Sequence, residues 1–364
     1  MAYEVDFISV SDSNSKQDAD AIVIRWKDGE NYKIAVYDGG LQAHGEKMCN
    51  HLNCYYFDDN QDKVIDAVIV SHSDQDHTSG LKTILENFTV NGLYMNRPWL
   101  YAEELYDKIS DGRITINSLE QRLKDKYSYI ADLESIAEEK GIPIYETFAG
   151  DKIEDRFLVL SPSREFYLQL IVESDKTPLE EAAKGGVVYK LAQSFSRYVK
   201  SLLETWDFET LHEDVSTSAE NEMSVVLYGD MVEEGALLVG DAGLRALKSA
   251  NLYALENDIS LKEKVKFMQI PHHGGRHNVS TSLLDSIIGK RVTKDTEIGK
   301  TAFVCAAEKS DHPLQMVMNA YVRRGVKVYT AKGNIIHHHR NMPTREGWTA
   351  LTKEKFNPNV EEWD

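Results

Sequence analysis

Four side chains that could bind metal ions lie close together in the segment Ser71-His72-Ser73-Asp74-Gln75-Asp76-His77. Imidazole nitrogens and carboxylate oxygens both bind divalent cations of borderline or hard character. Spacings this short let side chains in a tight loop diverge toward two ions. The alternative is a solvated polar loop that contains two histidines by chance. The density of ligands favours a metal site built from His72, Asp74, Asp76 and His77.

Three further segments place polar side chains at the end of an apolar run or before a helical stretch. Asp241 follows an apolar run over residues 237–240, and a carboxylate in that place could bridge two cations about 3.5–4 Å apart. His272 and His273 follow the run 265–270 and precede two glycines, which let the backbone pass close to an ion. His312 precedes a helical stretch, where it could contact a substrate oxygen or the metal shell, or simply begin the helix. An ordinary turn is the alternative for each of the first two segments.

The pattern around these segments predicts a core of strands and helices. The loop 72–77 follows a nearly continuous apolar run over residues 64–71, which is typical of an inner strand covered on both faces. A helix is expected over residues 42–57 and another from residue 80 onward. The other expected strands cover residues 3–10, 21–26, 33–37, 223–228, 236–240, 265–270, 301–304 and 326–330. Residues 334–340 could form a strand with one inward histidine.

The middle of the chain has a different character from the two ends. Apolar residues recur at helical spacing over residues 116–136 and again over residues 188–206. We therefore divide the chain into a first half of the core at 1–95, a helical insertion or lid at 96–220, and a second half of the core at 221–364. The insertion could also serve as a surface for a protein partner.

Composition and charge exclude several classes of protein. The 364 residues are 42% hydrophobic and 27% charged, as in ordinary globular proteins. No stretch approaches the roughly 18 apolar residues needed to cross a membrane, and the first residues do not read as a secretory signal, so we expect a cytoplasmic protein without membrane contact. Three cysteines without a CxxC pair indicate neither a disulfide framework nor a thiolate metal site. The net charge of −18 argues against a broad grip on nucleic acid, although a phosphate ester could still enter a metal-centred pocket.

These segments, in this order, resemble the metallo-β-lactamase superfamily, whose common loop reads HxHxDH. The closer likeness is to the hydrolase domain of the competence DNA-uptake protein ComEC and its stand-alone relatives, which often read SHxDxDHxGG. The likeness covers roughly residues 3–95 and 221–340. It is carried by Ser71–Gly80, Asp38-Gly39-Gly40, Asn221–Leu227, Gly240-Asp241, Pro271–Gly274, Asp311-His312-Pro313 and Val326–Thr330.

The resemblance implies an α/β fold, a four-layer αββα sandwich with a largely helical insertion, and two divalent metal ions at the edge between its sheets. His72 and Asp74 would hold one ion, and Asp76 and His77 would favour the other. Asp241 would bridge them, and either His272 or His273 would complete a shell. Many members carry a third histidine for the first ion between the loop and the bridging Asp, but His212 is the one histidine in that interval and its context does not match. Asp74 in place of a histidine makes the site harder, which favours zinc or manganese over zinc alone.

The function that follows from the resemblance is metal-dependent hydrolysis, with a phosphodiesterase or nuclease acting on nucleic acid or a nucleotide as the first hypothesis. Asp76 would orient the attacking water, and His312 would protonate or steady the leaving group. Two alternatives stay open. The substrate could be a carbon ester, lactone or thioester, or the protein could be a regulatory one that keeps the fold without turnover.

Overall fold

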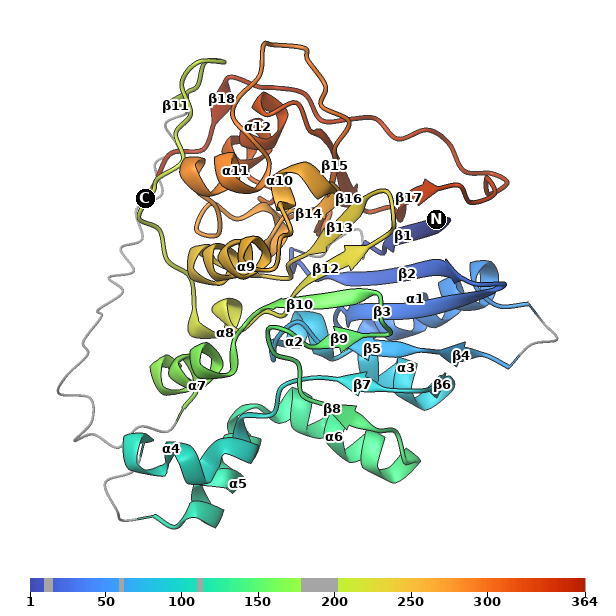
Figure 1. Cartoon of the computed structure of the whole chain (residues 1–364), viewed down its shortest axis with the longest axis vertical. Helices are drawn as coiled ribbons and strands as arrows, with labels where there is room; N and C mark the ends of the chain where they lie inside the picture. The colour runs from blue at the N-terminus through green and yellow to red at the C-terminus, as the bar shows by residue number, and fades with distance from the viewer. Residues whose placement is uncertain (10–15, 59–61, 110–113, 178–201, 364) are drawn as a thin grey trace.

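Two β-sheets packed face to face form the centre of the molecule in this computed structural model (Figure 1). The structure describes residues 1–9, 16–58, 62–109, 114–177 and 202–363. The first sheet has the order β17-β1-β2-β3-β5-β7-β8, and the second has the order β16-β15-β14-β13-β12-β10-β9. Each sheet thus combines strands from the beginning of the chain, or from its middle, with strands from the C-terminal half.

Among the described residues, each of the two large sheets has seven strands. Those of the first sheet are β1 (Tyr3–Phe7), β2 (Ala21–Asp28), β3 (Asn31–Gly39), β5 (Ala67–Ile69), β7 (Leu93–Tyr94), β8 (Ile144–Tyr145) and β17 (Ile336–Arg340). Those of the second sheet are β9 (Lys152–Ile153), β10 (Phe157–Ser161), β12 (Val226–Asp230), β13 (Gly235–Leu238), β14 (Val265–Gln269), β15 (Thr301–Ala306) and β16 (Lys327–Lys332). Two small pairs, β4 (Val64–Ile65) with β6 (Thr89–Val90) and β11 (Leu202–Leu203) with β18 (Asn359–Val360), lie apart from them.

Strand β2 shows why the two sheets stack. Ile22, Ile24 and Trp26 enter the core between the sheets, whereas Ala21 and Val23 point to the outer face and pack in the core beneath the helices. Successive side chains of a strand point to opposite faces, so a strand that is apolar at every position must be covered on both sides. The fold therefore needs a helical layer outside each sheet.

Helices supply these two outer layers. The helical core of the first half includes α1 (Gln42–Tyr55), α3 (Leu81–Asn87), η1 (Pro98–Tyr101), α4 (Ala102–Ile109), α5 (Ile116–Lys126), α6 (Ser128–Lys140) and α7 (Arg164–Glu173). The core outside the second sheet includes α9 (Leu244–Glu256), α10 (Leu261–Lys264), α11 (Thr281–Ile287) and α12 (Gln315–Arg323). The single turns α2 (Gln75–Thr78), α8 (Ala219–Glu222) and η3 (His272–Gly274) lie in connecting loops. The predicted four-layer αββα arrangement is confirmed.

The range 96–220 contains more than helices. Its strand β8 pairs with β7 in the first sheet, and β9 and β10 join the second sheet beside β12. The helical pattern over 116–136 corresponds to α5 and α6, whereas the pattern over 188–206 falls mainly on residues 178–201, outside the described residues. The division of the chain at residues 95 and 220 stays a prediction, but this range contributes strands to both sheets because the chain crosses from one sheet to the other within it.

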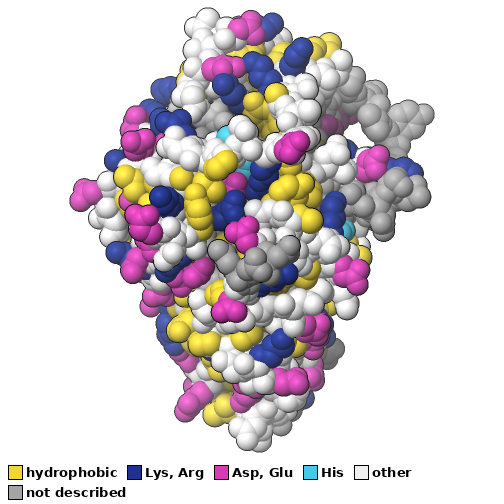
Figure 2. Space-filling model, turned by 90° about the vertical axis from the view of Figure 1, so that its right-hand side faces the viewer, with side chains coloured by type: hydrophobic (Ala, Val, Ile, Leu, Met, Phe, Trp, Pro, Cys, Tyr) yellow, Lys and Arg dark blue, Asp and Glu magenta, His cyan; other side chains and the backbone are white. Residues whose placement is uncertain are grey.

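Further expectations from the sequence concern membrane-spanning helices, the strand near residue 338 and the cysteines. Among the described helices, none is both long and apolar enough to cross a membrane. Residues 336–340 form β17, and the ring of His338 turns inward to stack on Phe267 with ring centroids 4.6 Å apart. Cys49 and Cys305 are buried, and Cys54 is exposed; all three are free thiols. On the face shown in Figure 2, acidic and basic side chains are interspersed despite the net negative charge.

Candidate metal centre

The polar segments singled out in the sequence meet at one edge of the sandwich, where strands from both sheets end. In the first sheet β3 runs parallel to β5, and Asp38 and the loop 70–74 lie at their carboxyl ends. In the second sheet β13 runs parallel to β14, and Asp241 and His272 follow these strands. Asp20 precedes β2, which is antiparallel to β3, so it lies at the same edge. Parallel strands that end together bring segments distant in sequence into one cluster.

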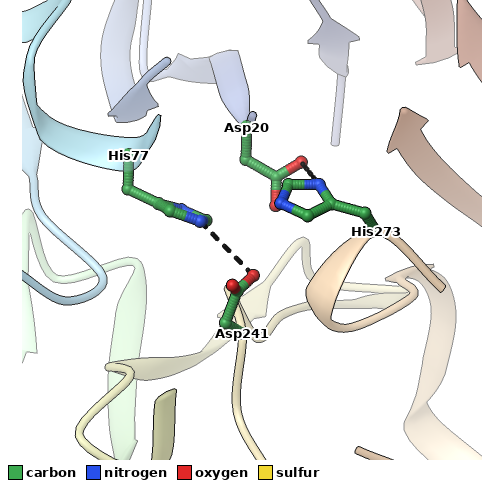
Figure 3. Close-up of side chains that lie close together, drawn as sticks. All are labelled: Asp20, His77, Asp241 and His273. Atoms are coloured by element: carbon green, nitrogen blue, oxygen red, sulfur yellow. Dashed lines mark ion pairs between the residues drawn. The ribbon is translucent and has the colours of Figure 1, made fainter. Parts of the chain in front are cut away.

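Four buried side chains at this edge form a candidate metal-binding group. Potential ligand atoms of Asp20, His77, Asp241 and His273 all lie within 4.8 Å of one another. Figure 3 shows the four side chains pointing toward a common centre from separate segments of the chain. His77 follows β5 of the first sheet, and Asp241 follows β13 of the second. The group therefore exists only when the two sheets are packed together.

Asp241 presents its two carboxylate oxygens to different histidines. Its Oδ1 lies 3.4 Å from Nε2 of His77. Its Oδ2 lies 3.5 Å from Nε2 of His272 and 4.0 Å from Nε2 of His72. The carboxylate therefore stands between two groups of imidazole nitrogens.

The remaining carboxylates of the loop divide between the same two groups. Oδ2 of Asp74 lies 3.6 Å from Nε2 of His72. Oδ2 of Asp76 lies 3.8 Å from Nε2 of His77 and 3.7 Å from Nε2 of His273. His72 and Asp74 thus lie on one side of Asp241, and Asp76 and His77 lie on the other. The structure brings together all seven residues that the sequence proposed as metal ligands.

Each of the four imidazoles is held by its Nδ1 atom and leaves Nε2 for the centre of the cluster. The Nδ1 partners are Ser71 Oγ for His72 at 3.0 Å, Asp38 Oδ2 for His77 at 2.8 Å, Asn278 Oδ1 for His272 at 2.8 Å and the Cys305 carbonyl for His273 at 3.2 Å. A hydrogen bond at Nδ1 fixes the ring and its tautomer, which is how metal-binding histidines are commonly oriented.

Several buried atoms that face the centre have no hydrogen-bond partner. They are Nε2 of His72, His77 and His273 and Oδ1 of Asp20 and Asp241. An unpaired buried polar atom costs about 1–3 kcal/mol, so five of them at one point need an explanation. A divalent cation bound by nitrogen and carboxylate donors would satisfy these atoms, and the donor set fits such an ion.

The pKa values of the cluster show an excess of negative charge. Burial lowers the pKa of His77, but Asp241, Asp38 and Asp76 outweigh it and raise the pKa well above its ordinary value. Burial also opposes the charged form of His273, yet Asp20 and Asp241 raise its pKa to about 10. The carboxylates therefore favour positive charge at the positions of these imidazoles, and a cation would supply that charge.

Asp20 and Asp38 belong to the site although the sequence assigned neither of them a role. Asp38 Oδ1 accepts a hydrogen bond from the Ser71 backbone N–H at 2.8 Å while its Oδ2 contacts His77. Asp20 Oδ2 accepts from Gln269 Nε2 at 2.8 Å, and its Oδ1 lies 3.7 Å from Nδ1 of His273. Asp38 ends an apolar strand in an Asp-Gly-Gly turn, which was a usable signal. Asp20 lies directly before β2, and no motif around it in the sequence indicates a metal ligand.

The backbone is bent at the residues that carry these side chains. Asp38 has φ of 58°, His272 has φ of 47° and His273 has φ of 54°, all in the left-handed region that side chains other than glycine seldom adopt. Such conformations cost of order 1–3 kcal/mol each and persist where the surroundings fix them. The two adjacent histidines use this conformation to point toward the cluster together.

His312 and Lys176 lie at the rim of the cluster. The ring of His312 is 6.3 Å from that of His272, and its Nδ1 lies 2.8 Å from Oδ2 of Asp18. About a third of the His312 side chain is exposed. Lys176, from the middle of the chain, forms an ion pair with Oδ1 of Asp74. His212 instead stacks on Trp363 with ring centroids 3.8 Å apart.

The match to a known family coincides with the first part of this site. Residues 18–156, which include Asp20, Asp38 and the loop 72–77, match the family model described as the metallo-β-lactamase superfamily. The chain has the metallo-β-lactamase fold. The candidate metal-binding group lies where the two sheets of the fold meet.

The solved structures that match this chain are distant from it in sequence. A diphosphatase from the PhnP family is 9% identical, with a TM-score of 0.40 over 93% of this chain and 98% of the other. The metallo-β-lactamase fold protein YhfI from Bacillus subtilis is 9% identical, with a TM-score of 0.41 over 93% and 100%. The dizinc quorum-quenching lactonase AidC is 11% identical, with a TM-score of 0.29 over 67% and 68%. No curated protein matches the sequence.

Proposed function

We propose that the protein is a hydrolase with two metal ions and that its substrate is a phosphodiester. The observation that carries the proposal is the position of Asp241, whose Oδ1 and Oδ2 face different imidazole Nε2 atoms. A carboxylate in this position could bind one cation through each of its oxygens. A single ion would leave one of the two groups of nitrogens without a partner.

The distances divide the proposed ligands into two sets that share Asp241. The first set contains His72, Asp74 and His272. The second set contains Asp76, His77 and His273, and a carboxylate oxygen of Asp20 also lies within 4.8 Å of ligand atoms of His77, Asp241 and His273. In this assignment both histidines of the pair are ligands, one for each ion, and His272 takes the place of the third histidine that many members of the superfamily carry elsewhere in the chain.

Zinc or manganese suits these donors. Asp74 and Asp76 add hard oxygen ligands to sets that otherwise consist of imidazoles and the shared Asp241. When bound, two such cations would supply a nucleophilic water at neutral pH and offset the negative charge of the transition state.

The chain's own side chains would handle protons around that reaction. Asp76 lies between His77 and His273 and would orient the attacking water. His312 stands at the rim with Nδ1 held by Asp18, so its Nε2 would be the atom that donates a proton to the leaving oxygen.

The choice of a phosphodiester is supported by the motif likeness to the ComEC-type hydrolase domain and its relatives. The net charge of −18 disfavours a long nucleic-acid contact on this chain alone, which points to a compact phosphate ester, such as a nucleotide or the end of a strand. A carbon ester or lactone would react at the same site, so parallel assays with bis-p-nitrophenyl phosphate and with a lactone discriminate between these substrates.

The experiment that tests catalysis is the double substitution Asp76→Asn with Asp241→Asn. We expect loss of hydrolysis with a circular dichroism spectrum like that of the unsubstituted protein. The matched control is Asp66→Asn with Asp230→Asn, because these two aspartates accept backbone hydrogen bonds away from the cluster. Hydrolysis that survives the first double substitution would reject the assignment.

Metal content separates an enzyme from a regulatory protein that has kept the fold. We expect close to two equivalents of zinc or manganese by plasma mass spectrometry after growth with both metals. A protein that holds no ion under these conditions would favour the non-catalytic alternative.

A further inference from the structure

Lys176 approaches the cluster from a part of the chain that the sequence motifs do not reach. It follows α7 and forms an ion pair with Oδ1 of Asp74, while Oδ2 of the same carboxylate lies 3.6 Å from Nε2 of His72. One oxygen of Asp74 therefore faces the lysine, and the other faces the first ligand set.

The carboxylate of Asp74 needs a different kind of partner to orient it than the histidine rings do. Each histidine of the cluster has its ring fixed by a partner at Nδ1. A carboxylate has a broad preference about its terminal torsion, so on its own it does not direct one oxygen toward an ion. The ammonium group of Lys176 does for Asp74 what the Nδ1 partners do for the imidazoles.

Lys176 is itself anchored by a small buried network. Its backbone N–H donates to Ser174 Oγ at 3.0 Å, and Tyr127 OH donates to the same oxygen at 3.0 Å. The Ser174 hydroxyl in turn donates to Glu220. The Lys176 ammonium lies 5.9 Å from the centre of the Tyr127 ring. These contacts fix the base of the lysine side chain and leave its end free to reach Asp74.

We propose that Lys176 is a positioning residue for the first metal ion: by binding Oδ1 of Asp74 it turns Oδ2 of that carboxylate toward His72. The inference rests on the proposed metal site. It gives the range 96–220 a defined task, because this range supplies a partner for Asp74, the carboxylate at the position where the common loop HxHxDH has a histidine.

The test compares metal binding by the full-length protein and three variants. Lys176→Gln removes the charge but keeps a polar side chain, Lys176→Arg keeps the charge, and Lys82→Gln is the matched control. Lys82 forms an ion pair with Asp132 between α3 and α6, so the control also removes one lysine and one ion pair. Manganese and zinc are titrated separately into chelator-treated protein, and the affinity of each equivalent is measured.

We expect Lys176→Gln to weaken one of the two equivalents by about 10- to 100-fold, the usual effect of removing a group that orients a ligand. The other equivalent should be unchanged, Lys176→Arg should recover most of the loss, and Lys82→Gln should bind both ions as the unsubstituted protein does. In a protein that already carries Asp74→Ala, the further change Lys176→Gln should have no effect. A general loss of packing would not follow this pattern.

The result distinguishes this inference from the proposed function. If Lys176→Gln binds both equivalents with unchanged affinity, or still lowers the affinity in the Asp74→Ala background, the positioning role is wrong. If the unsubstituted protein binds fewer than two ions, the two-ion site is wrong and this inference is rejected with it. If both ions bind but no phosphodiester is hydrolysed, the substrate proposal fails while the role of Lys176 stands or falls on the titration alone.

Discussion

Asp38 holds His77 from behind the metal centre, with its Oδ2 2.8 Å from Nδ1 of the imidazole. The other oxygen, Oδ1, accepts from the Ser71 backbone N–H at 2.8 Å, and the side chain is fully buried. One carboxylate thereby joins the end of β3 to the loop that follows β5. The direction of the His77 ring depends on this link, because the other contact of its Nδ1, with Ser71 Oγ, is longer at 3.5 Å.

The substitution Asp38→Asn tests that link. An amide has one accepting oxygen, so it cannot accept from both the Ser71 N–H and the imidazole N–H. We expect metal affinity to fall by about 10- to 100-fold at the equivalent that His77 binds. Isothermal titration with zinc measures it, and Asp66→Asn serves as the control. Equal affinities of the Asp38→Asn variant and the unsubstituted protein would contradict the role given to Asp38.

Removal of metal should lower stability. The cluster buries carboxylates and imidazole nitrogens whose unpaired atoms face one another. An ion that binds only the folded state adds about 4 kcal/mol to the free energy of unfolding when its concentration is 1,000 times its Kd. We expect a chelator to lower the melting temperature measured by calorimetry and re-added manganese or zinc to restore it.

Asp241→Asn provides the control for that measurement. Because Asp241 faces both sets of nitrogens, the variant should show little change in melting temperature when the chelator is added. A chelator effect as large in this variant as in the unsubstituted protein would place the stabilising metal elsewhere.

His338, in strand β17, predicts that the free energy of unfolding falls at acidic pH. Burial, followed by the neighbouring His337 and His339, lowers its pKa to about 3. The unfolded chain, with a histidine pKa of about 6.5, binds a proton that the folded protein excludes between these two values. The free energy of unfolding should therefore be highest above about pH 6.5 and fall by up to about 1.4 kcal/mol for each pH unit below it.

The comparison for this prediction is His338→Gln, since glutamine keeps a partner for the Tyr3 hydroxyl, which lies 3.1 Å from His338 Nε2. Urea unfolding at pH 7.0 and at pH 5.5, with chelator present in both proteins, should show roughly 1 kcal/mol less loss in the variant. An equal loss in both proteins would mean that His338 titrates normally.

His312 should matter for the leaving group and not for metal binding. If it protonates the leaving oxygen, His312→Gln should lower kcat by about 10²- to 10⁴-fold for a poor leaving group such as an alkoxide. The loss should be much smaller for p-nitrophenolate, which leaves without a proton. Metal content should be unchanged. The same loss with both leaving groups would argue for a role in binding instead.

The sequence by itself indicated the proposed loop ligands, the strand before them and the general order of the core. The nearly continuous apolar run before His72 indicated an inner strand, because a strand with apolar side chains on both faces needs cover on both. The structure has β5 (Ala67–Ile69) there, and Asp66 separates it from β4 (Val64–Ile65). The segments around Asp241 and His272 were found for the same reason. Local patterns of this kind are visible because neighbouring residues in the chain are also neighbours in a strand or loop.

Only the tertiary structure decided how these segments divide the site. Asp20 and Lys176 carry no local signal, since each acts on a side chain from another part of the fold, namely His273 and Asp74. The sequence also left His272 and His273 as alternatives. The structure turns both inward, on opposite sides of Asp241, because the two residues adopt left-handed backbone conformations that no residue pattern predicted. Spacing along a chain shows which groups are near in sequence. The side of the Asp241 carboxylate that each group faces depends on how the two sheets pack.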